Sequence, residues 1–520
     1  MGDTRRKQDT AVAALAGAAA AILGAGLGEL AAALFAPASS PFAVIGGAII
    51  DAAPPWGKDL AIALFGTNDK IALLTGIGIV LILLAGLAGI LQLRKPPWGL
   101  VILGAFGVVG AVVALTRSDA SGIAWLPSVI AGAVSVVTLH YLVRMLRRRV
   151  ASEAGEVDAD ADTRPSRRQA LAWMGGATAV GVIAAVAGNI ARGGARAVTT
   201  VREALKLPAP ATTVPPIPAG AELDIPGISP LITPNAEFYR IDTALVVPQV
   251  DPASWRLRIH GMVEEEVELT WDELLALPLE ESTTTLTCVS NNVGGDLIGN
   301  AVWLGCPLRE LLARARPTAD ADMVLSTSVD GFTAGTPLEA LTDDRDAILA
   351  IGMNGEPLPP EHGFPVRMVV PGLYGYVSAT KWVVDLEVTR FDQAEGYWTP
   401  RGWSALGPIK LQSRIDVPRS GVTLPVGETV IAGVAWQQHV GVAGVEVKID
   451  DGPWQQAELA TAISDDTWVQ WSIPWDATDP GQHTIRCRAT NVDGETQTSD
   501  QAPPAPNGAT GWHTIIANVS

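Results

Sequence analysis

Cysteine and charge are both scarce in this sequence. There are three cysteines in 520 residues, Cys288, Cys306 and Cys487. Three thiols are too few for a disulfide framework, and their spacing fits no zinc-binding pattern. Charged residues make up 17% of the chain and hydrophobic residues 48%. A composition this apolar excludes an ordinary, purely soluble protein.

The few charges are distributed unevenly along the chain. Residues 1–206 contain 19 Lys and Arg against 13 Asp and Glu, whereas residues 207–520 contain 17 against 41. A basic, apolar first part and an acidic second part predict a membrane region followed by a soluble region. The acidic part would repel nucleic acid, which excludes that class of partner.

Five apolar runs are long enough to cross about 30 Å of hydrocarbon as helices. They cover residues 11–35, 71–93, 98–116, 124–143 and 169–190. We therefore predict an all-α transmembrane bundle within residues 1–190. Residues 41–53 are apolar but too short to span, which favours an interfacial or re-entrant segment. Glu29 is the one acidic residue inside the first run, where it faces a partner helix or reaches the interface.

Basic residues next to the apolar runs predict the orientation of the bundle. If the runs alternate in direction, the clusters near Arg5, Lys95, Arg147 and Arg168 all fall on one side. By the positive-inside rule that side is the cytoplasm. Five crossings then place everything after about residue 190 outside the cell membrane, so we expect a multi-pass protein with an extracytoplasmic soluble region.

A pair of arginines precedes the fifth run. The segment from Ser166 through Arg167 and Arg168 to Leu171 resembles a twin-arginine export signal, here inside the chain instead of at its start. The residues alone equally fit an ordinary basic flank of a membrane helix. The motif by itself leaves both interpretations open.

The soluble region has three predicted parts. Residues 191–235 are rich in proline and predict an extended tether. Residues 236–400 mix β-type runs such as 366–370 and 382–388 with short helical patterns such as 271–277 and 308–315, which indicates an α+β domain. Residues 405–520 contain short β-type runs separated by Gly, Asp and Pro, which is typical of a small β-sandwich.

Cys288 is the thiol whose surroundings point to chemistry. It stands at the end of a β-type run and before a polar loop that contains Gly294 and Gly295. Loops at strand ends commonly display reactive groups. A thiolate suits a soft or high-valent metal, but one ligand cannot hold a metal alone. A cofactor such as a dithiolene would have to supply the other ligands. The alternative is a buried structural cysteine.

Several motifs in the α+β domain resemble the sulfite oxidase family of molybdopterin-dependent oxidoreductases. They are residues 285–291 (TLTCVSN), 299–308 (GNAVWLGCPL), 353–367 (MNGEPLPPEHGFPVR), 369–372 (VVPG) and 381–382 (KW). The resemblance covers about residues 236–400, with the motifs in the family's order. It implies a molybdenum cofactor with one pyranopterin and a direct metal–thiolate bond from Cys288.

The same resemblance implies roles for further residues. Positions that bind the pterin and its phosphate are occupied by Arg240, His362, Arg367, Ser378 and Lys381, and the active-site tyrosine position by Tyr397. The family has an Asn-His pair after the arginine, whereas this chain has Ile241 and Asp242. Either Asp242 takes the place of that histidine or the contact is missing. The sequence contexts of Cys306 and Cys487 favour structural roles for both.

The resemblance also bears on export and on the last domain. A cofactor assembled in the cytosol must cross the membrane inside a folded protein, which favours the twin-arginine interpretation of Arg167 and Arg168. Residues 405–520 resemble the family's immunoglobulin-like dimerisation domain, which implies a homodimer. His140 is the one histidine of six inside a predicted membrane helix, so this chain alone offers no bis-histidine haem site. We expect a separate electron-transfer partner, a cytochrome or a quinone-linked protein.

The sequence departs from the family at the positions that bind a dianionic substrate. Two arginines bind sulfite in the family, and here Val293 and Val440, beside His439, stand in their places. Each missing charged hydrogen bond is worth about 1.5–3 kcal/mol. Oxygen-atom transfer on a small and less charged sulfur compound, for instance reduction of a sulfoxide, therefore fits better than plain sulfite oxidation. An inactive membrane scaffold that keeps the fold is the non-enzymatic alternative.

Membrane topology gives the first testable prediction. A reporter fused after Ser520 should be active only outside the cell membrane, and changing Arg167 and Arg168 to Lys should block export of the folded domain. Export of active protein from a strain that lacks twin-arginine transport would contradict the interpretation of the motif.

Overall fold

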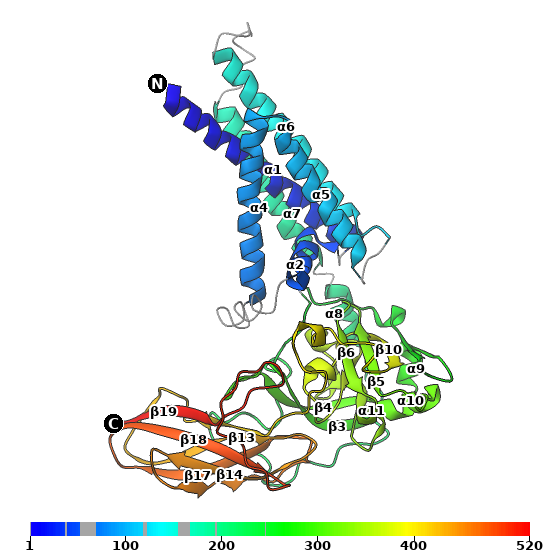
Figure 1. The fold of residues 1–520 in the computed structure, drawn as a ribbon, viewed down its shortest axis with the longest axis vertical. Helices are drawn as coiled ribbons and strands as arrows, with labels where there is room; N and C mark the ends of the chain where they lie inside the picture. The colour runs from blue at the N-terminus through cyan, green and yellow to red at the C-terminus, as the bar shows by residue number, and fades with distance from the viewer. Residues whose placement is uncertain are drawn as a thin grey trace. The chain divides into compact units, whose positions relative to one another are not determined.

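The computed structural model describes residues 2–36, 39–52, 69–117, 122–153, 167–192, 195–244 and 246–520. The chain divides into two compact units (Figure 1). The helical unit is Met1–Val198 with Ala244–Val247, and the β-rich unit is Thr199–Thr243 with Pro248–Ser520. Ser166 of the expected export signal lies outside the described residues.

Long apolar helices dominate the helical unit. They are α1 (Gly2–Phe35), α4 (Asp69–Arg94), α5 (Trp98–Thr116), α6 (Leu126–Glu153) and α7 (Arg167–Arg192). These five helices cover the five predicted apolar runs, and each is long and apolar enough to cross a membrane. Helix α6 continues ten residues beyond residue 143, where the prediction ended. Its arginine-rich last turns are good helix formers, although hydropathy does not count them.

Small residues let these helices approach one another closely. A Cβ atom at Gly107 of α5 would lie 2.8 Å from the Cα of Gly132 in α6, so only glycine fits this crossing. Large apolar side chains instead point outward, such as Leu83, Val108 and Ile183, which are 68%, 62% and 66% exposed. Small residues inside and large apolar residues outside are typical of helices packed in lipid.

Glu29 has a defined structural partner in α2 (Pro41–Ala52). Its side chain is 3% exposed. Its carboxylate accepts hydrogen bonds from the Ser40 hydroxyl at 2.8 and 2.9 Å and from the Phe42 backbone N–H at 3.2 Å. The carboxylate therefore satisfies donors at the start of α2, where a negative charge is also favourable. This placement matches the expectation that Glu29 faces a partner element.

Two sheets form the first part of the β-rich unit. One has the strand order β2-β1-β10-β5-β6 and the other β3-β4-β7-β8, with β9 also paired to β7. Their strands are β1 (Arg256–Gly261), β2 (Val267–Thr270), β3 (Glu280–Thr287), β4 (Ile298–Pro307), β5 (Met323–Ser328), β6 (Thr333–Pro337), β7 (Ile348–Met353), β8 (Glu356–Pro357), β9 (Arg367–Val369) and β10 (Val383–Thr389). The short helices are α9 (Trp271–Leu275), α10 (Leu308–Ala315) and α11 (Glu339–Thr342).

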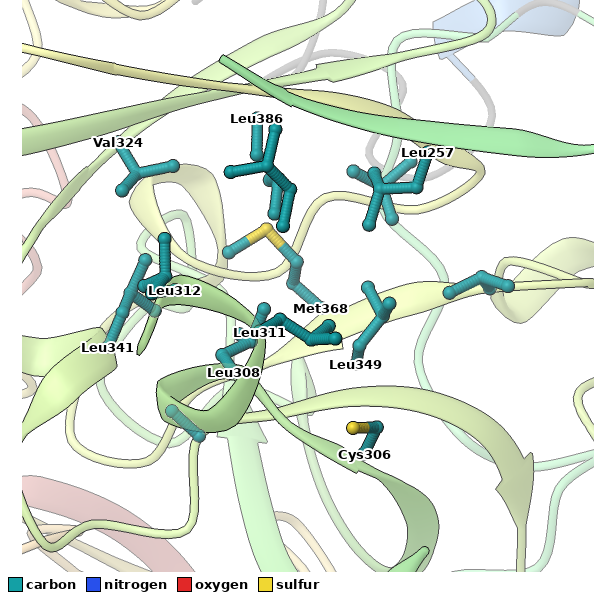
Figure 2. Packing of buried hydrophobic residues seen from close by; sticks show 14 of the residues in the cluster. Leu257, Cys306, Leu308, Leu311, Leu312, Val324, Leu341, Leu349, Met368 and Leu386 are labelled. Carbon is teal, nitrogen blue, oxygen red and sulfur yellow. The ribbon is translucent and has the colours of Figure 1, made fainter. Parts of the chain in front are cut away.

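One apolar core joins these two sheets and α10. Figure 2 shows Leu257 and Leu386 of the first sheet facing Leu349 and Met368 of the second. Leu308, Leu311 and Leu312 of α10 pack into the same core and are fully buried. Cys306 belongs to this core, which agrees with the structural role expected for it.

The C-terminal part consists of two further sheets around a shared core. Their orders are β11-β13-β17-β16 and β12-β19-β18-β14-β15. The strands are β11 (Gln412–Val417), β12 (Thr423–Leu424), β13 (Gly427–Trp436), β14 (Val442–Ile449), β15 (Trp454–Gln456), β16 (Glu458–Leu459), β17 (Val469–Ala477), β18 (Gly481–Asn491) and β19 (His513–Val519). Ile431 and Trp471 of one sheet and Val447 and Cys487 of the other share the core. We call this part the sandwich. Its likeness to an immunoglobulin domain stays a prediction.

The segment expected as an extended, proline-rich linker, residues 191–235, contacts other parts of the β-rich unit. Helix α8 (Ala195–Ala204) is followed by an extended chain without regular structure. Arg202 bonds to the carbonyl of Pro357 at 2.7 Å and forms an ion pair with Glu356 at 3.0 Å. Farther on, the Leu223 N–H bonds to Gln470 of the sandwich at 2.6 Å. Proline prevents helix formation but does not stop an extended chain from docking.

Candidate functional site

Cys288 directly follows β3 and begins a tight loop. Its thiol is 8% exposed, and its Sγ accepts a hydrogen bond from the Ser290 N–H at 3.4 Å. The Cys288 N–H donates to the carbonyl of Leu297, and the Asn291 side chain accepts from the Leu297 N–H, which closes the loop. Burial raises the pKa of this thiol, while the charge of Lys381 opposes the shift. Burial thus favours the neutral thiol, whereas a bound metal cation would favour the thiolate.

The strand that leads to Cys288 lies at the edge of its sheet, so one side of its backbone needs other partners. At its start, the Glu281 N–H bonds to the carbonyl of Thr212 in the proline-rich segment. At Thr285, the N–H donates to the carbonyl of Asp466, and the carbonyl accepts from the Gln438 amide at 2.9 Å. The same Gln438 nitrogen reaches the Thr287 hydroxyl at 2.9 Å. The sandwich thus supports the strand up to the residue before Cys288.

The Cys288 loop also contacts the sandwich directly. Arg414 of β11 donates to the carbonyl of Gly295 at 2.8 Å and is itself held by Asp416 at 2.6 Å. The ring of His513 fills the space beside Gly294, where a Cβ atom would collide with it. Gly294 also has a φ of +77°, a conformation that favours glycine. Burial lowers the pKa of His513 to about 4, so this ring is neutral at pH 7.

Arg367 in β9 is a buried cation whose hydrogen-bond partners are carbonyl groups. It is 5% exposed and lies over the Trp303 ring at 5.0 Å. Its guanidinium donates to the carbonyls of Met368, His362 and Ala379 at 3.3, 3.1 and 3.5 Å. No carboxylate of the described residues forms an ion pair with it. Burial lowers its pKa to about 10, and a buried charge in this state favours an anionic ligand.

Lys381 lies opposite Arg367 in an isolated antiparallel bridge. Its ammonium donates to Asp242 at 2.6 Å and to the Glu361 carbonyl at 3.1 Å. Asp242 also accepts from Arg240 at 2.9 Å, so one buried carboxylate joins two of the predicted cofactor-binding cations. Burial lowers the pKa of Lys381 to about 8 even though Asp242 opposes the shift. Asp242 is thus a counter-ion of Arg240 and Lys381.

His362 and Ser378 complete the predicted binding residues. His362 is 3% exposed, and its Nε2 lies 3.0 Å from the carbonyl of Asn235. Burial lowers its pKa to about 4, so the ring is neutral and its Nε2–H donates to that carbonyl, which leaves Nδ1 as an acceptor. The Ser378 hydroxyl donates to the Leu373 and Tyr374 carbonyls at 3.2 and 3.0 Å. Its single proton is therefore engaged inside the chain.

Two tyrosines that the sequence did not point to also belong to the surroundings of Cys288. Tyr239 and Tyr374 both interact electrostatically with Cys288, and burial raises the pKa of each, that of Tyr374 to about 12. Tyr239 also interacts with Arg367. The Tyr397 ring instead packs against Phe332, with the Arg401 guanidinium 3.7 Å from its centroid. Tyr239 directly precedes Arg240, one of the predicted cofactor-binding residues, but no local sequence pattern distinguishes it.

The positions of the missing substrate arginines lie among apolar and acidic residues. Val293 is half-buried in the Cys288 loop. His439, next to Val440, has its Nδ1 3.3 Å from the Asp466 carboxylate. Ligand atoms of His439, Asp343 and Asp344 lie within 4.8 Å of one another. Acidic groups therefore already surround the imidazole, which makes it a poor free cation for a dianion.

Comparison with known proteins identifies the domain that contains these residues. Residues 244–398 match the family model described as the oxidoreductase molybdopterin binding domain. The mitochondrial sulfite oxidase of Rattus norvegicus is 32% identical over 271 residues, which cover 44% of this chain and 49% of the relative. The chain thus spans about half the length of this relative.

Two further similarities concern bacterial proteins. The uncharacterized oxidoreductase YuiH of Bacillus subtilis is 32% identical over 173 residues, which cover 33% of this chain and 84% of the relative. The crystal structure of the sulfane dehydrogenase SoxCD from Paracoccus pantotrophus superposes with a TM-score of 0.49 at 24% identity, over 56% of this chain and 84% of that one.

The contact between the sandwich and β3 generates a prediction about stability. Gln438→Leu removes both donors from Thr285 and Thr287 and leaves the Thr285 carbonyl buried without a partner. We expect a loss of about 1–3 kcal/mol, seen as a lower midpoint of thermal unfolding of the detergent-solubilised chain. Gln455→Ala, at an exposed position in β15, is the control and should leave the midpoint unchanged. Equal midpoints for both variants would show that the hydrogen bonds from Gln438 to Thr285 and Thr287 contribute nothing to the stability of the chain.

Proposed function

Because this chain belongs to the sulfite oxidase family of molybdopterin-dependent oxidoreductases, we propose that it is a membrane-anchored molybdenum enzyme that transfers oxygen atoms to or from a small sulfur compound. The observation that carries this proposal is the buried Arg367. No carboxylate of the described residues forms an ion pair with its guanidinium. Arg367 interacts electrostatically with Tyr239, and Tyr239 interacts in the same way with the Cys288 thiol. Purified chain should contain molybdenum and pterin and should turn over such a substrate.

The residues present fit a molybdenum cofactor with one pyranopterin. Cys288 offers the single thiolate, which is too little to hold a metal without a dithiolene. Arg240, Arg367 and Lys381 offer positive charge for a phosphate, and His362 and Ser378 offer acceptors for pterin N–H groups. When bound, the cofactor supplies the two-electron redox chemistry and the exchangeable oxygen.

The chain itself contributes binding, orientation and a limited supply of protons. Neutral His362 and the buried Arg367 keep fixed orientations because backbone carbonyls hold both. Burial raises the pKa of Tyr239, which favours its neutral phenol, and this phenol would be a hydrogen-bond donor at the site. Tyr397 keeps its predicted role as a second phenol at the site, and an activity comparison of Tyr239→Phe with Tyr397→Phe would rank the two.

Membrane attachment places the reaction on the outer side of the cell membrane in this proposal. Its support is the five apolar helices with large side chains facing outward and the basic flanks that predict their orientation. Electrons would pass to or from a separate cytochrome or quinone-linked partner. The sandwich, residues 405–520, would be the surface of a homodimer.

Two observations favour a weakly charged substrate over sulfite. Val293 cannot pair with an anion, and acidic side chains surround His439. A sulfoxide, reduced with electrons from the partner, fits such a pocket. A plain sulfite oxidase or dehydrogenase is the second candidate. An inactive scaffold is separated from all of these by metal analysis, since it has no need of molybdenum.

The metal ligand gives a sharp prediction. Cys288→Ser should lower turnover by on the order of a thousandfold or more, because a hydroxyl is a poor ligand for this metal. Pterin content should fall little, since the phosphate-binding cations lie elsewhere. Cys306→Ala, which changes a thiol in the apolar core, is the control and should keep most of the activity. Full turnover by the Cys288 variant would exclude it as the ligand.

The charge of the substrate gives a further prediction. Sulfite should bind the unmodified protein weakly and with little salt dependence, because paired charges are missing. Val293→Arg with Val440→Arg should tighten sulfite binding by roughly tenfold or more per arginine. Val426→Arg adds the same charge at an exposed turn of the sandwich and should have no effect. Saturation of the unmodified enzyme at micromolar sulfite would instead support the plain sulfite oxidase assignment.

A further inference from the structure

Asp242 occupies an unusual position for a carboxylate. Its side chain is 4% exposed and lies between two cations of the proposed cofactor site. Its Oδ2 accepts from the Lys381 ammonium at 2.6 Å and from Arg240 Nε at 2.9 Å, and its Oδ1 lies 3.5 Å from a terminal nitrogen of Arg240. These are the donors that an incoming phosphate would use.

The neighbouring Arg367 provides the contrast. It faces Lys381 across an antiparallel bridge, yet its partners are backbone carbonyls. Arg367 therefore forms no ion pair with a carboxylate of the described residues, whereas Arg240 and Lys381 share the carboxylate of Asp242. A carboxylate and a phosphate compete for the same N–H donors, because both bind them through charged oxygens.

We propose that Asp242 is the resident counter-ion of the phosphate site, which holds Arg240 and Lys381 in the cofactor-free protein and releases them when the phosphate of the cofactor binds. This inference rests on the proposed function, because it takes these cations to be the phosphate ligands. Asp242 belongs to a segment without helix or strand, so its side chain can leave without breaking regular structure. Until then it balances the buried Lys381 ammonium, whose charge would be costly without a partner, and it also pairs with the more exposed Arg240.

The competing role for Asp242 is a purely supporting one. A carboxylate that stays in place would orient Lys381 toward the phosphate, and its removal would weaken binding. A carboxylate that is displaced opposes binding, and its removal would strengthen it. The two roles therefore predict opposite signs for the same substitution.

The test measures binding of inorganic phosphate to the full chain, purified in detergent from cells unable to make the cofactor. Binding is followed by the rise in thermal unfolding temperature with phosphate concentration. For Asp242→Asn we expect half-saturation at about a tenfold lower phosphate concentration, the effect of removing one close opposing charge. Glu361→Gln is the matched control, because it removes a neighbouring negative charge whose side chain does not bond to Lys381.

Phosphate binding by the two variants distinguishes displacement of Asp242 from a supporting role. Tighter phosphate binding in Asp242→Asn but not in Glu361→Gln supports displacement. Equal tightening in both variants shows a general charge effect and overturns the proposal. Weaker or unchanged binding in Asp242→Asn overturns it as well, in favour of the supporting role.

A measurement on the unmodified chain covers the case in which Asp242→Asn fails to fold. Carboxyl groups are labelled with a carbodiimide and glycinamide, with and without saturating phosphate, and Asp242 is followed by peptide mass spectrometry. Displacement predicts more labelling of Asp242 when phosphate is bound. Unchanged or reduced labelling overturns the proposal.

Failure of this inference can be told apart from failure of the proposed function. Molybdenum and pterin are measured in the unmodified chain from cofactor-producing cells. If both are present, the cofactor assignment stands whatever Asp242 does. If both are absent and phosphate does not bind, the proposed function itself fails.

Discussion

The edge of strand β3 is the constraint on which the site depends. An edge strand presents N–H and C=O groups that must find partners when they are buried. In this chain two distant segments supply them, the proline-rich segment at Thr212 and the sandwich at Gln438 and Asp466. Since Cys288 follows this strand directly, the position of the thiol depends on Thr212, 76 positions before it, and on Gln438 and Asp466, 150 and 178 positions after it.

A second constraint is the free-energy cost of burying positively charged side chains away from water. The chain offsets this cost in three ways. Arg367 bonds to backbone carbonyls, and Lys381 pairs with Asp242. His362 is neutral because burial lowers its pKa. All three lie between residues 362 and 381, and the bridge between Arg367 and Lys381 brings the two ends of this segment together. Arg367 keeps its charge without an acidic partner among the described residues, so an anion bound here would offset the cost of its burial.

The fold was predictable where the signal is local. Hydropathy located the five long helices, and short amphipathic patterns located α9 and α10. The contacts that organise the site are non-local, so no pattern marked them. The sequence identified Asp242 as a departure from the family's Asn-His pair, but no sequence pattern predicted its pairing with Lys381, 139 residues later. Proline content predicts that residues 207–235 are extended, but composition does not reveal that this segment pairs with the edge of β3.

The close fit between Gly294 and His513 has a consequence for how such proteins diversify. The loop that carries the thiol belongs to the family's recurring domain, whereas the ring that fills the space beside it lies in the last strand of the chain. A sandwich borrowed from another protein would bring a different side chain to this point, and any residue larger than glycine in the loop would exclude the present one. The two parts are therefore inherited as a matched pair, and recombination at their boundary is a poor route to new variants.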